Sequence, residues 1–438
     1  MKNNNDKSTP LSRFLLRGEN KIKRNTFFWN AFGAVMNSFQ TMLLLLVITR
    51  TGNDNDSSIF VMAYAVGNLV LNLGKYGVRQ YQVTDVNEEH SLKDYIQARY
   101  ASMTMMMVAI GAYLLVKIFN GGYTREKVIV ILCICLVKAV EAFEDVYQGR
   151  MQQKGRLDTA GRILGIRLLI FIIGYAVMYI LTKNLVLTSV VNLAITVVLS
   201  IIMNGCVMYK FKEEDRETDK HSVNRILIEC LPLCACMCHN MYVANAPKYT
   251  IDTVVSDDIQ TKFNIIFMPV FIIALLANFI FQPFLKGMGE TWSEGKTGKL
   301  ARTAFKFTIV IVIIDLVITF VGSFIGAPVL GAVYGVNLKD MNKELIVFML
   351  AGGLVALQNL YIMIITTVRH QKYMIYGYIG TGLLMLLFSG KALGSDGSHL
   401  LRLCVYFFGI LSLLTIYCIG LITYAILKRK KQQVEERK

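Results

Sequence analysis

Long apolar blocks without charge limit this chain to folds that cross a membrane. Three of them, Thr26–Thr49, Leu345–Val368 and Leu403–Leu427, contain no Asp, Glu, Lys or Arg. Each is long enough to cross the hydrocarbon core of a bilayer, which takes about 20 helical residues. Of the 438 residues, 54% are hydrophobic and only 17% are charged, which is not typical of a soluble globular chain. The sequence therefore predicts an all-α integral membrane protein.

Twelve apolar segments are expected to form transmembrane helices. They are 26–49, 57–75, 99–119, 127–148, 160–182, 185–208, 225–247, 260–285, 304–325, 345–368, 373–390 and 403–427. With the N-terminus inside, the inner segments and adjoining helix ends hold 34 of the 46 Lys and Arg, and the outer ones hold 11. Since cytoplasmic loops carry the excess of basic residues, both termini are predicted to lie in the cytoplasm.

The longest polar interruption, 209–224, divides the chain into two halves of six predicted spans each. Two such halves form either parallel repeats or two unrelated bundles. The predicted organisation is a basic cytoplasmic tail at 1–25, a six-helix lobe at 26–208, a cytoplasmic linker at 209–224, a second six-helix lobe at 225–427 and a basic cytoplasmic tail at 428–438.

The fourth predicted span holds the densest set of polar residues inside an apolar segment. They are Lys138, Glu141, Glu144, Asp145 and Gln148. At 100° per residue they share one side of a helix, and Lys138 is spaced to pair with Glu141. A charge at the bilayer centre costs roughly 2.5–3.5 kcal/mol, so each needs a partner or a watery cavity. In one interpretation they form a buried ion-pair network, with the last two acids neutralised by Arg162 and Arg167. In the other they line a cavity whose acid binds a coupling cation or proton.

Asp315 stands alone in the middle of the ninth predicted span, in the segment TIVIVIIDLVITF. A single carboxylate at that depth requires a cationic partner or a proton. Two roles stay open for it: coupling of transport to protons, or an ion pair with Lys138 or another base. We predict no cofactor, and a dependence on protons or sodium ions that involves Asp315 and the acids of the fourth span.

Basic residues near helix ends form a second candidate set. Asn72, Lys75 and Arg79 lie at i, i+3 and i+7, so on a helix they share one face at the inner end of the second span. Arg50 and Lys248 lie at the outer ends of the first and seventh spans. Such side chains either anchor a helix at the membrane interface or bind an anionic substrate. We interpret Lys75 as an anchor, and Arg50, Arg79 and Lys248 as candidates for substrate binding.

Motifs for metal binding, nucleotide binding and catalysis are absent from the sequence. Cys230, Cys234 and Cys238 share one helix face, but packing explains small polarizable residues there better than metal coordination does. No glycine-rich phosphate loop and no nucleophile–base arrangement occurs in a polar segment. The net charge of +16 comes mostly from loops and tails, where basic residues set membrane topology. We therefore expect no metal site, no catalytic residue and no nucleic-acid partner.

Five segments of the chain resemble the bacterial polysaccharide-transport family. They are YGVRQYQVTDV at 76–86, DYIQAR at 94–99, EDVYQGRMQQKGRLDTAGR at 144–162, NAPKYTID at 245–252 and PVLGAVYGVNL at 328–338. That family belongs to the exporter superfamily for multidrug compounds, oligosaccharidyl lipids and polysaccharides, which also contains lipid II flippases. By hydropathy and order, the resemblance covers nearly the whole chain. Some relatives have fourteen spans, whereas twelve are predicted here.

The resemblance implies a flippase in the plasma membrane of a bacterium. Such a protein moves oligosaccharide repeat units on undecaprenyl diphosphate by alternating access, for the synthesis of O-antigen lipopolysaccharide or capsule. The resemblance also implies two six-helix lobes around a central cavity, with cations at the positions of Arg50, Arg79 and Lys248. The implied partners are the lipid-linked oligosaccharide, membrane lipids and other proteins of polysaccharide assembly. Arg and Lys suit the diphosphate, because they bind phosphate oxygens with charge-assisted hydrogen bonds.

Two other functions stay open. A cation-coupled multidrug exporter of the same superfamily needs an acidic cavity, which the cations at the helix ends disfavour. A membrane-embedded glycan polymerase or ligase needs a large outer loop with Arg and His. Every predicted outer loop is under about 25 residues, and His399 is the only outer histidine. We therefore expect a transporter and not an enzyme.

Overall fold

The computed structural model describes residues 9–17, 22–51, 54–119, 123–211, 219–251, 259, 262–263, 265–270, 273, 280–334, 336–394 and 399–435. All regular structure in these residues is helical, which confirms the predicted all-α class. The chain divides into two compact units, unit 1 over Met1–Cys234 and unit 2 over Ala235–Lys438, and each is described by itself.

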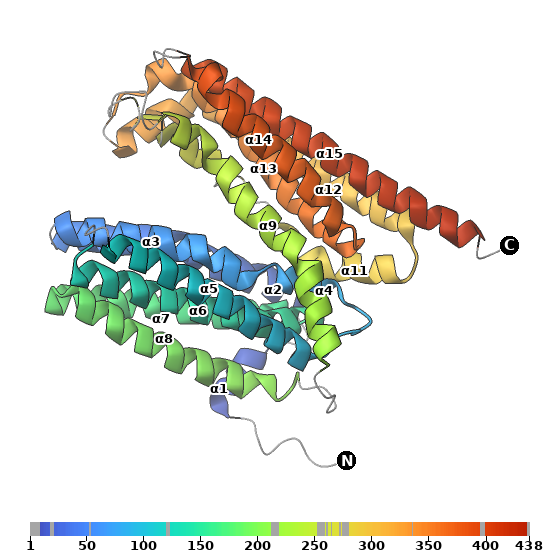
Figure 1. Cartoon of the computed structure of the whole chain (residues 1–438), viewed down its shortest axis with the longest axis horizontal. Helices are drawn as coiled ribbons and strands as arrows, with labels where there is room; N and C mark the ends of the chain where they lie inside the picture. Colours follow the sequence, from blue (N-terminus) through green and yellow to red (C-terminus); the bar gives the residue numbers. More distant parts are fainter. Residues whose placement is uncertain are drawn as a thin grey trace. The chain divides into compact units, whose positions relative to one another are not determined.

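In the described part of unit 1, six long helices and two short ones precede α9. They are α1 (Pro10–Leu16), α2 (Ile22–Thr51), α3 (Asp54–Lys75), α4 (Val78–Thr84), α5 (Leu92–Phe119), α6 (Arg125–Gln153), α7 (Leu157–Thr182) and α8 (Leu185–Met208). Helices α3, α5, α6, α7 and α8 lie side by side (Figure 1). The boundary between the units falls inside α9 (Lys220–Ile251), whereas the predicted linker was 209–224. Residues 212–218 of that linker lie outside the described residues.

Side-chain caps mark where the long helices α6 and α8 begin. The Thr124 hydroxyl accepts the Lys127 N–H at 3.3 Å before α6, and the Asn184 side chain accepts the Leu187 N–H at 2.9 Å before α8. Lys183 has a φ of 51°, in the left-handed region where helices end. Helices α7 and α8 are therefore joined by a turn of two residues, which makes them antiparallel neighbours.

Glycines allow α2 and α7 to approach each other closely. A Cβ atom on Gly161 would lie 2.7 Å from the backbone carbonyl of Trp29, and one on Gly165 would lie 2.4 Å from the Phe32 ring. Small residues four positions apart let helix backbones meet in a membrane, where lipid removes the hydrophobic drive for association. The pair Gly161 and Gly165 therefore sets the distance between these two helices.

Unit 2 is built around one nearly buried helix. Its described elements are η3 (Gln282–Phe284), α11 (Leu285–Ser293), α12 (Thr297–Tyr334), η4 (Lys339–Met341), α13 (Asn342–Thr367), η5 (Gln371–Tyr373), α14 (Met374–Leu393) and α15 (Leu400–Glu435). Helix α13 packs against α12 and α15 (Figure 1). In its most apolar stretch, 72% of the residues are buried. The Gln358 side chain of α13 donates to the Leu411 carbonyl of α15 at 3.3 Å.

Nine of the twelve predicted spans correspond to described helices that are long and apolar enough to cross a membrane. The fourth, 127–148, is part of α6, which carries more charge than the other nine. The seventh, 225–247, lies in α9, and the eighth, 260–285, lies largely outside the described residues. The chain is thus a multi-pass helical membrane protein.

Candidate functional site

The polar stripe of α6 faces α3, α4 and α5 within unit 1. We define it as Lys138, Glu141, Asp145, Gln148 and Gln152. These positions recur every three or four residues, so one side of the helix carries all five. All five side chains are buried. The stripe therefore needs polar partners from the neighbouring helices, and the ion pairs below supply them.

Glu141 contacts two lysines. The Nζ atoms of Lys138, one turn earlier in α6, and of Lys75, at the end of α3, each lie 3.0 Å from one of its carboxylate oxygens. The Lys138 side chain is only 2% exposed, whereas that of Lys75 is 27% exposed. Lys138 also lies 5.5 Å from the centre of the Tyr64 ring, a favourable cation–π distance. Our interpretation of Lys75 as an interface anchor therefore missed its ion pair with α6.

Asp145 contacts two arginines in the same manner. Arg99 of α5 lies 3.1 Å from one carboxylate oxygen, and Arg79 of α4 lies 3.4 Å from the other. The Arg99 side chain is fully buried, whereas that of Arg79 is 14% exposed. Arg79 also donates to the side-chain oxygens of Gln148 and Gln152, each at 2.9 Å. Arg79 is thus held against the stripe by three side chains.

Glu144 points to a different side of α6. It lies 2.7 Å from the Arg167 guanidinium and accepts a hydrogen bond from the Asn204 amide at 3.3 Å. The expected neutralisation of an acid by Arg167 is therefore confirmed. The expectation for Arg162 is wrong, because its guanidinium donates to the last carbonyls of α1, including that of Leu15 at 2.8 Å. Carbonyls at the end of a helix have no partner inside the helix and attract such a donor.

Positive charge exceeds negative charge around α6. Three acids of this helix, Glu141, Glu144 and Asp145, form ion pairs with five cations, which are Lys75, Arg79, Arg99, Lys138 and Arg167. The three buried cations already match the three acids one for one. The two positive charges in excess are therefore those of Lys75 and Arg79, which also have the most exposed side chains of the five.

A turn between two helices separates Lys75 from Arg79. The sequence pattern placed Lys75 and Arg79 on one face of a continuous helix, but α3 ends at Lys75 and α4 begins at Val78. Tyr76 and Gly77 between them have φ values of 50° and 71°. A Cβ on Gly77 would lie 2.6 Å from the Leu233 side chain of α9, so glycine permits both the turn and the close approach. Both cations still reach the polar stripe.

The acidic residues in the polysaccharide-transport motifs hold the loop after α4 in place. The Asp85 carboxylate accepts the His90 N–H at 3.2 Å and the Tyr95 hydroxyl at 2.9 Å. The Asp94 carboxylate accepts the Ser222 hydroxyl of α9 at 3.0 Å. These bonds tie the loop to α5 and to the start of α9.

Glu88 in the same loop pairs with the end of α6. Its carboxylate lies 3.1 Å from the Arg150 guanidinium and also contacts the Lys154 ammonium. Partial burial alone would raise the pKa of Glu88, but the hydrogen bond from Lys154 and the charge of Arg150 outweigh it and lower that pKa from its ordinary value of 4.5. The carboxylate is therefore charged at neutral pH and clamps the loop onto α6.

The other predicted site residues are Arg50, Lys248 and Asp315. Arg50 is exposed in the last turn of α2, and Lys248 lies in α9 with its side chain outside the described residues. Asp315 of α12, in unit 2, is 7% exposed and faces Gly353 of α13. Its Oδ1 atom has no hydrogen-bond partner within the described part of the chain. Lys138, one of the bases considered as its partner, belongs to unit 1 and pairs there with Glu141.

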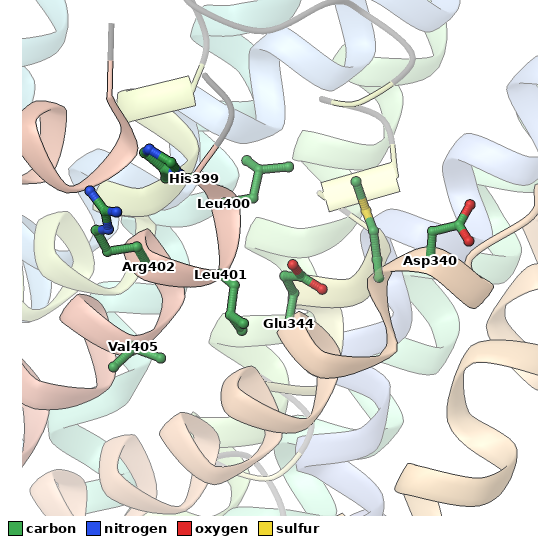
Figure 2. A pocket seen from close by; sticks show the side chains of 8 residues that line it. Asp340, Glu344, His399, Leu400, Leu401, Arg402 and Val405 are labelled. Atoms are coloured by element: carbon green, nitrogen blue, oxygen red, sulfur yellow. The ribbon is translucent and has the colours of Figure 1, made fainter. Parts of the chain in front are cut away.

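A cavity of about 600 Å³ opens in unit 2 where α13 and α15 begin. Asp340, Glu344, His399 and Arg402 line it with both signs of charge (Figure 2). The charged and titratable groups of its lining are thus two carboxylates, one guanidinium and one imidazole. The described residues contain no group of three or more His, Cys, Asp or Glu side chains arranged to hold a metal ion.

Solved structures decide the fold family. A multidrug resistance transporter of the MATE family and MOP superfamily, in an outward-facing conformation, superposes with a TM-score of 0.73 at 13% identity, over 97% of this chain and 99% of that chain. A MOP-superfamily transporter from Pyrococcus furiosus, described by the reversed polarity of its binding pocket, gives 0.70 at 11% identity over 97% and 98%. The chain has the MATE fold.

A sequence relative adds to this similarity. No family model matches the chain. The capsular polysaccharide biosynthesis protein CapF of Staphylococcus aureus is 23% identical over 323 residues, which cover 72% of this chain and 78% of that protein. The MATE fold and this relative together confirm the resemblance to polysaccharide-transport proteins of the MOP superfamily.

Proposed function

We propose that this protein is a transporter, not an enzyme, that moves oligosaccharides linked to undecaprenyl diphosphate across the bacterial plasma membrane. The observation that carries the proposal is the pair of excess cations, Lys75 and Arg79, on the polar stripe. A diphosphate joined to a lipid and a sugar carries two negative charges, and charge-assisted hydrogen bonds from two cations balance them. The similarity to CapF, a capsular polysaccharide biosynthesis protein, supports this substrate class.

The physics of the membrane suits such a substrate. The polyprenyl tail stays in lipid, while the charged head group and the sugars pass along protein polar groups by alternating access. An inside-negative potential of about 100 mV favours outward movement of an anion by about 2.3 kcal/mol per charge. With both termini in the cytoplasm, as the loop charges predict, Lys75 and Arg79 lie at the side where the precursor is loaded. Arg50 and Lys248 stay in this proposal as further head-group contacts, and other polysaccharide-assembly proteins as partners.

The proposal is tested by removing the two excess cations. Lys75→Gln and Arg79→Gln leave Glu141 with Lys138 and Asp145 with Arg99, so the fold keeps its buried ion pairs. In a strain that lacks the native gene, the double variant is expected to insert normally but to abolish surface polysaccharide and accumulate the lipid-linked precursor. Arg225→Gln, an exposed cation of α9, is the matched control and is expected to restore the polysaccharide. Full function of the double variant would remove both cations from the mechanism.

Coupling to protons or sodium ions is part of the same proposal. Asp315 supports it, because a buried carboxylate without a described cationic partner is a site for a proton or a small cation. Transport into vesicles is expected to depend on one of these gradients in the native protein and to lose that dependence in Asp315→Asn. A transport rate that does not change with the proton gradient or with the sodium gradient contradicts the proposed coupling.

A cation-coupled multidrug exporter is the second candidate. The similarity to a multidrug resistance MATE transporter and the isolated Asp315 favour it. Deletion of the gene then sensitises cells to cationic drugs and leaves surface polysaccharide intact. The polysaccharide proposal predicts the opposite pair of results.

A further inference from the structure

Each carboxylate on the polar stripe holds one buried cation and one partly exposed cation. Glu141 holds Lys138 at 2% exposure and Lys75 at 27%. Asp145, one turn later, holds Arg99 at 0% and Arg79 at 14%. The same arrangement therefore occurs twice, about 6 Å apart along the helix axis. The buried cation already neutralises the carboxylate, so the carboxylate does not need the partly exposed cation for its charge balance.

We propose that Glu141 and Asp145 are internal counter-anions, which release Lys75 and Arg79 to a diphosphate head group and take them back when it leaves. The inference rests on the proposed function, and it adds a reason why the diphosphate can leave the two cations again. Two cations without counter-anions would hold a dianion strongly and release it slowly. Two carboxylates beside them compete with the ligand, and they keep the empty site balanced inside a membrane, where uncompensated charge is costly.

Specificity for two linked charges follows from the geometry. A monoanion recruits only one of the two cations and leaves the other on its carboxylate. A diphosphate recruits both at once, and the second contact forms without a further loss of translational freedom. The site therefore selects a diphosphate diester, which carries two charges, over a phosphate diester, which carries one, although each cation alone binds either.

Variants that remove an acid together with its buried cation test the exchange. The pair Glu141→Gln with Lys138→Met frees Lys75, and the pair Asp145→Asn with Arg99→Met weakens the hold on Arg79. Each double variant is expected to bind undecaprenyl diphosphate in nanodiscs about tenfold more tightly than the native protein, which is within the usual range for coupled sites. Each is also expected to transport it more slowly in vesicles. Glu144→Gln with Arg167→Met removes the same chemistry from another side of α6 and is expected to leave both unchanged.

The results separate this inference from the proposed function. If Lys75→Gln with Arg79→Gln leaves diphosphate binding intact, the proposed function fails. If that variant abolishes binding, but the double variants of an acid and its buried cation have the native affinity and the native transport rate, only the exchange is overturned.

A spectroscopic measurement on the native protein avoids any folding defect of these variants. Infrared difference spectra upon addition of inorganic pyrophosphate are expected to show a shifted carboxylate stretch, which is lost in Lys75→Gln with Arg79→Gln. Binding of pyrophosphate without a change in the carboxylate region contradicts the exchange.

Discussion

Arg99 is the residue on which the charge network of α6 most depends. Its fully buried guanidinium joins Asp145 to the backbone carbonyl of Gly74, so it connects α5 to both α6 and α3. The sequence contains it in the segment DYIQAR, but nothing in that segment identifies its partner. A buried arginine whose acid lies in another helix cannot be assigned a role before the helices are packed.

Removal of Arg99 is expected to destabilise the protein strongly. Arg99→Met leaves Asp145 buried with only the longer contact to Arg79, and breaking a buried pair typically costs about 3–5 kcal/mol. Thermal unfolding in detergent measures the change. The double variant with Asp145→Asn is expected to be more stable than Arg99→Met alone, because the unpaired charge is gone. Arg225→Gln at the surface should change stability by less than about 0.5 kcal/mol. Equal stability of Arg99→Met and Arg225→Gln would contradict this role.

Glu88 gives the protein a stability component that depends on pH. Its pKa in the folded state lies below the ordinary value of 4.5, so the charged form stabilises the fold above that pH and the contribution is lost as the pH falls through the lowered pKa. Melting temperatures measured in detergent from neutral to acidic pH should decline less steeply for Glu88→Gln than for the native protein. Glu89→Gln, which has a more exposed and longer ion pair, is the control. Parallel curves for native protein and Glu88→Gln would refute the assignment.

At the scale of elements, the contact between α2 and α7 depends on one glycine more than on any charge. Gly161→Ala places a methyl group 2.7 Å from the Trp29 carbonyl, so the two helices must separate. The expected cost is about 1–3 kcal/mol, as for other overpacked contacts. Thermal unfolding measures it.

Gly111→Ala in α5 is the matched control for that substitution, because nothing lies within 4 Å of the added atom. It is expected to be neutral or to stabilise the helix by up to about 1 kcal/mol. The close contact between α2 and α7 is disproved as a constraint if both alanine variants unfold at the same temperature.

The topology of the whole molecule is open to direct test. Both termini are predicted to lie in the cytoplasm, because the inner segments hold 34 of the 46 Lys and Arg. In a background without native cysteines, single cysteines near either terminus should resist a membrane-impermeant thiol reagent in intact cells and react after lysis. A cysteine at Lys183, in the turn between α7 and α8, should react in intact cells. The reverse pattern would invert the topology and place Lys75 and Arg79 on the outer side.

The class and the helices of this protein follow from its sequence, because length, hydropathy and helical period are local properties. The sequence placed Lys138, Glu141 and Asp145 on one side of a helix for the same reason, but it also placed Glu144 there, which points to a different side. The partners of Glu141 and Asp145 in other helices could not be predicted from the sequence. Lys75 and Glu141 are 66 residues apart in the chain, and so are Arg79 and Asp145. Only the packing of α3, α4 and α5 against α6 decides that Glu141 and Asp145 each hold one buried cation and one partly exposed cation. Burial is a property of the assembled helices, and it distinguishes the buried cations from the two that we propose for substrate binding.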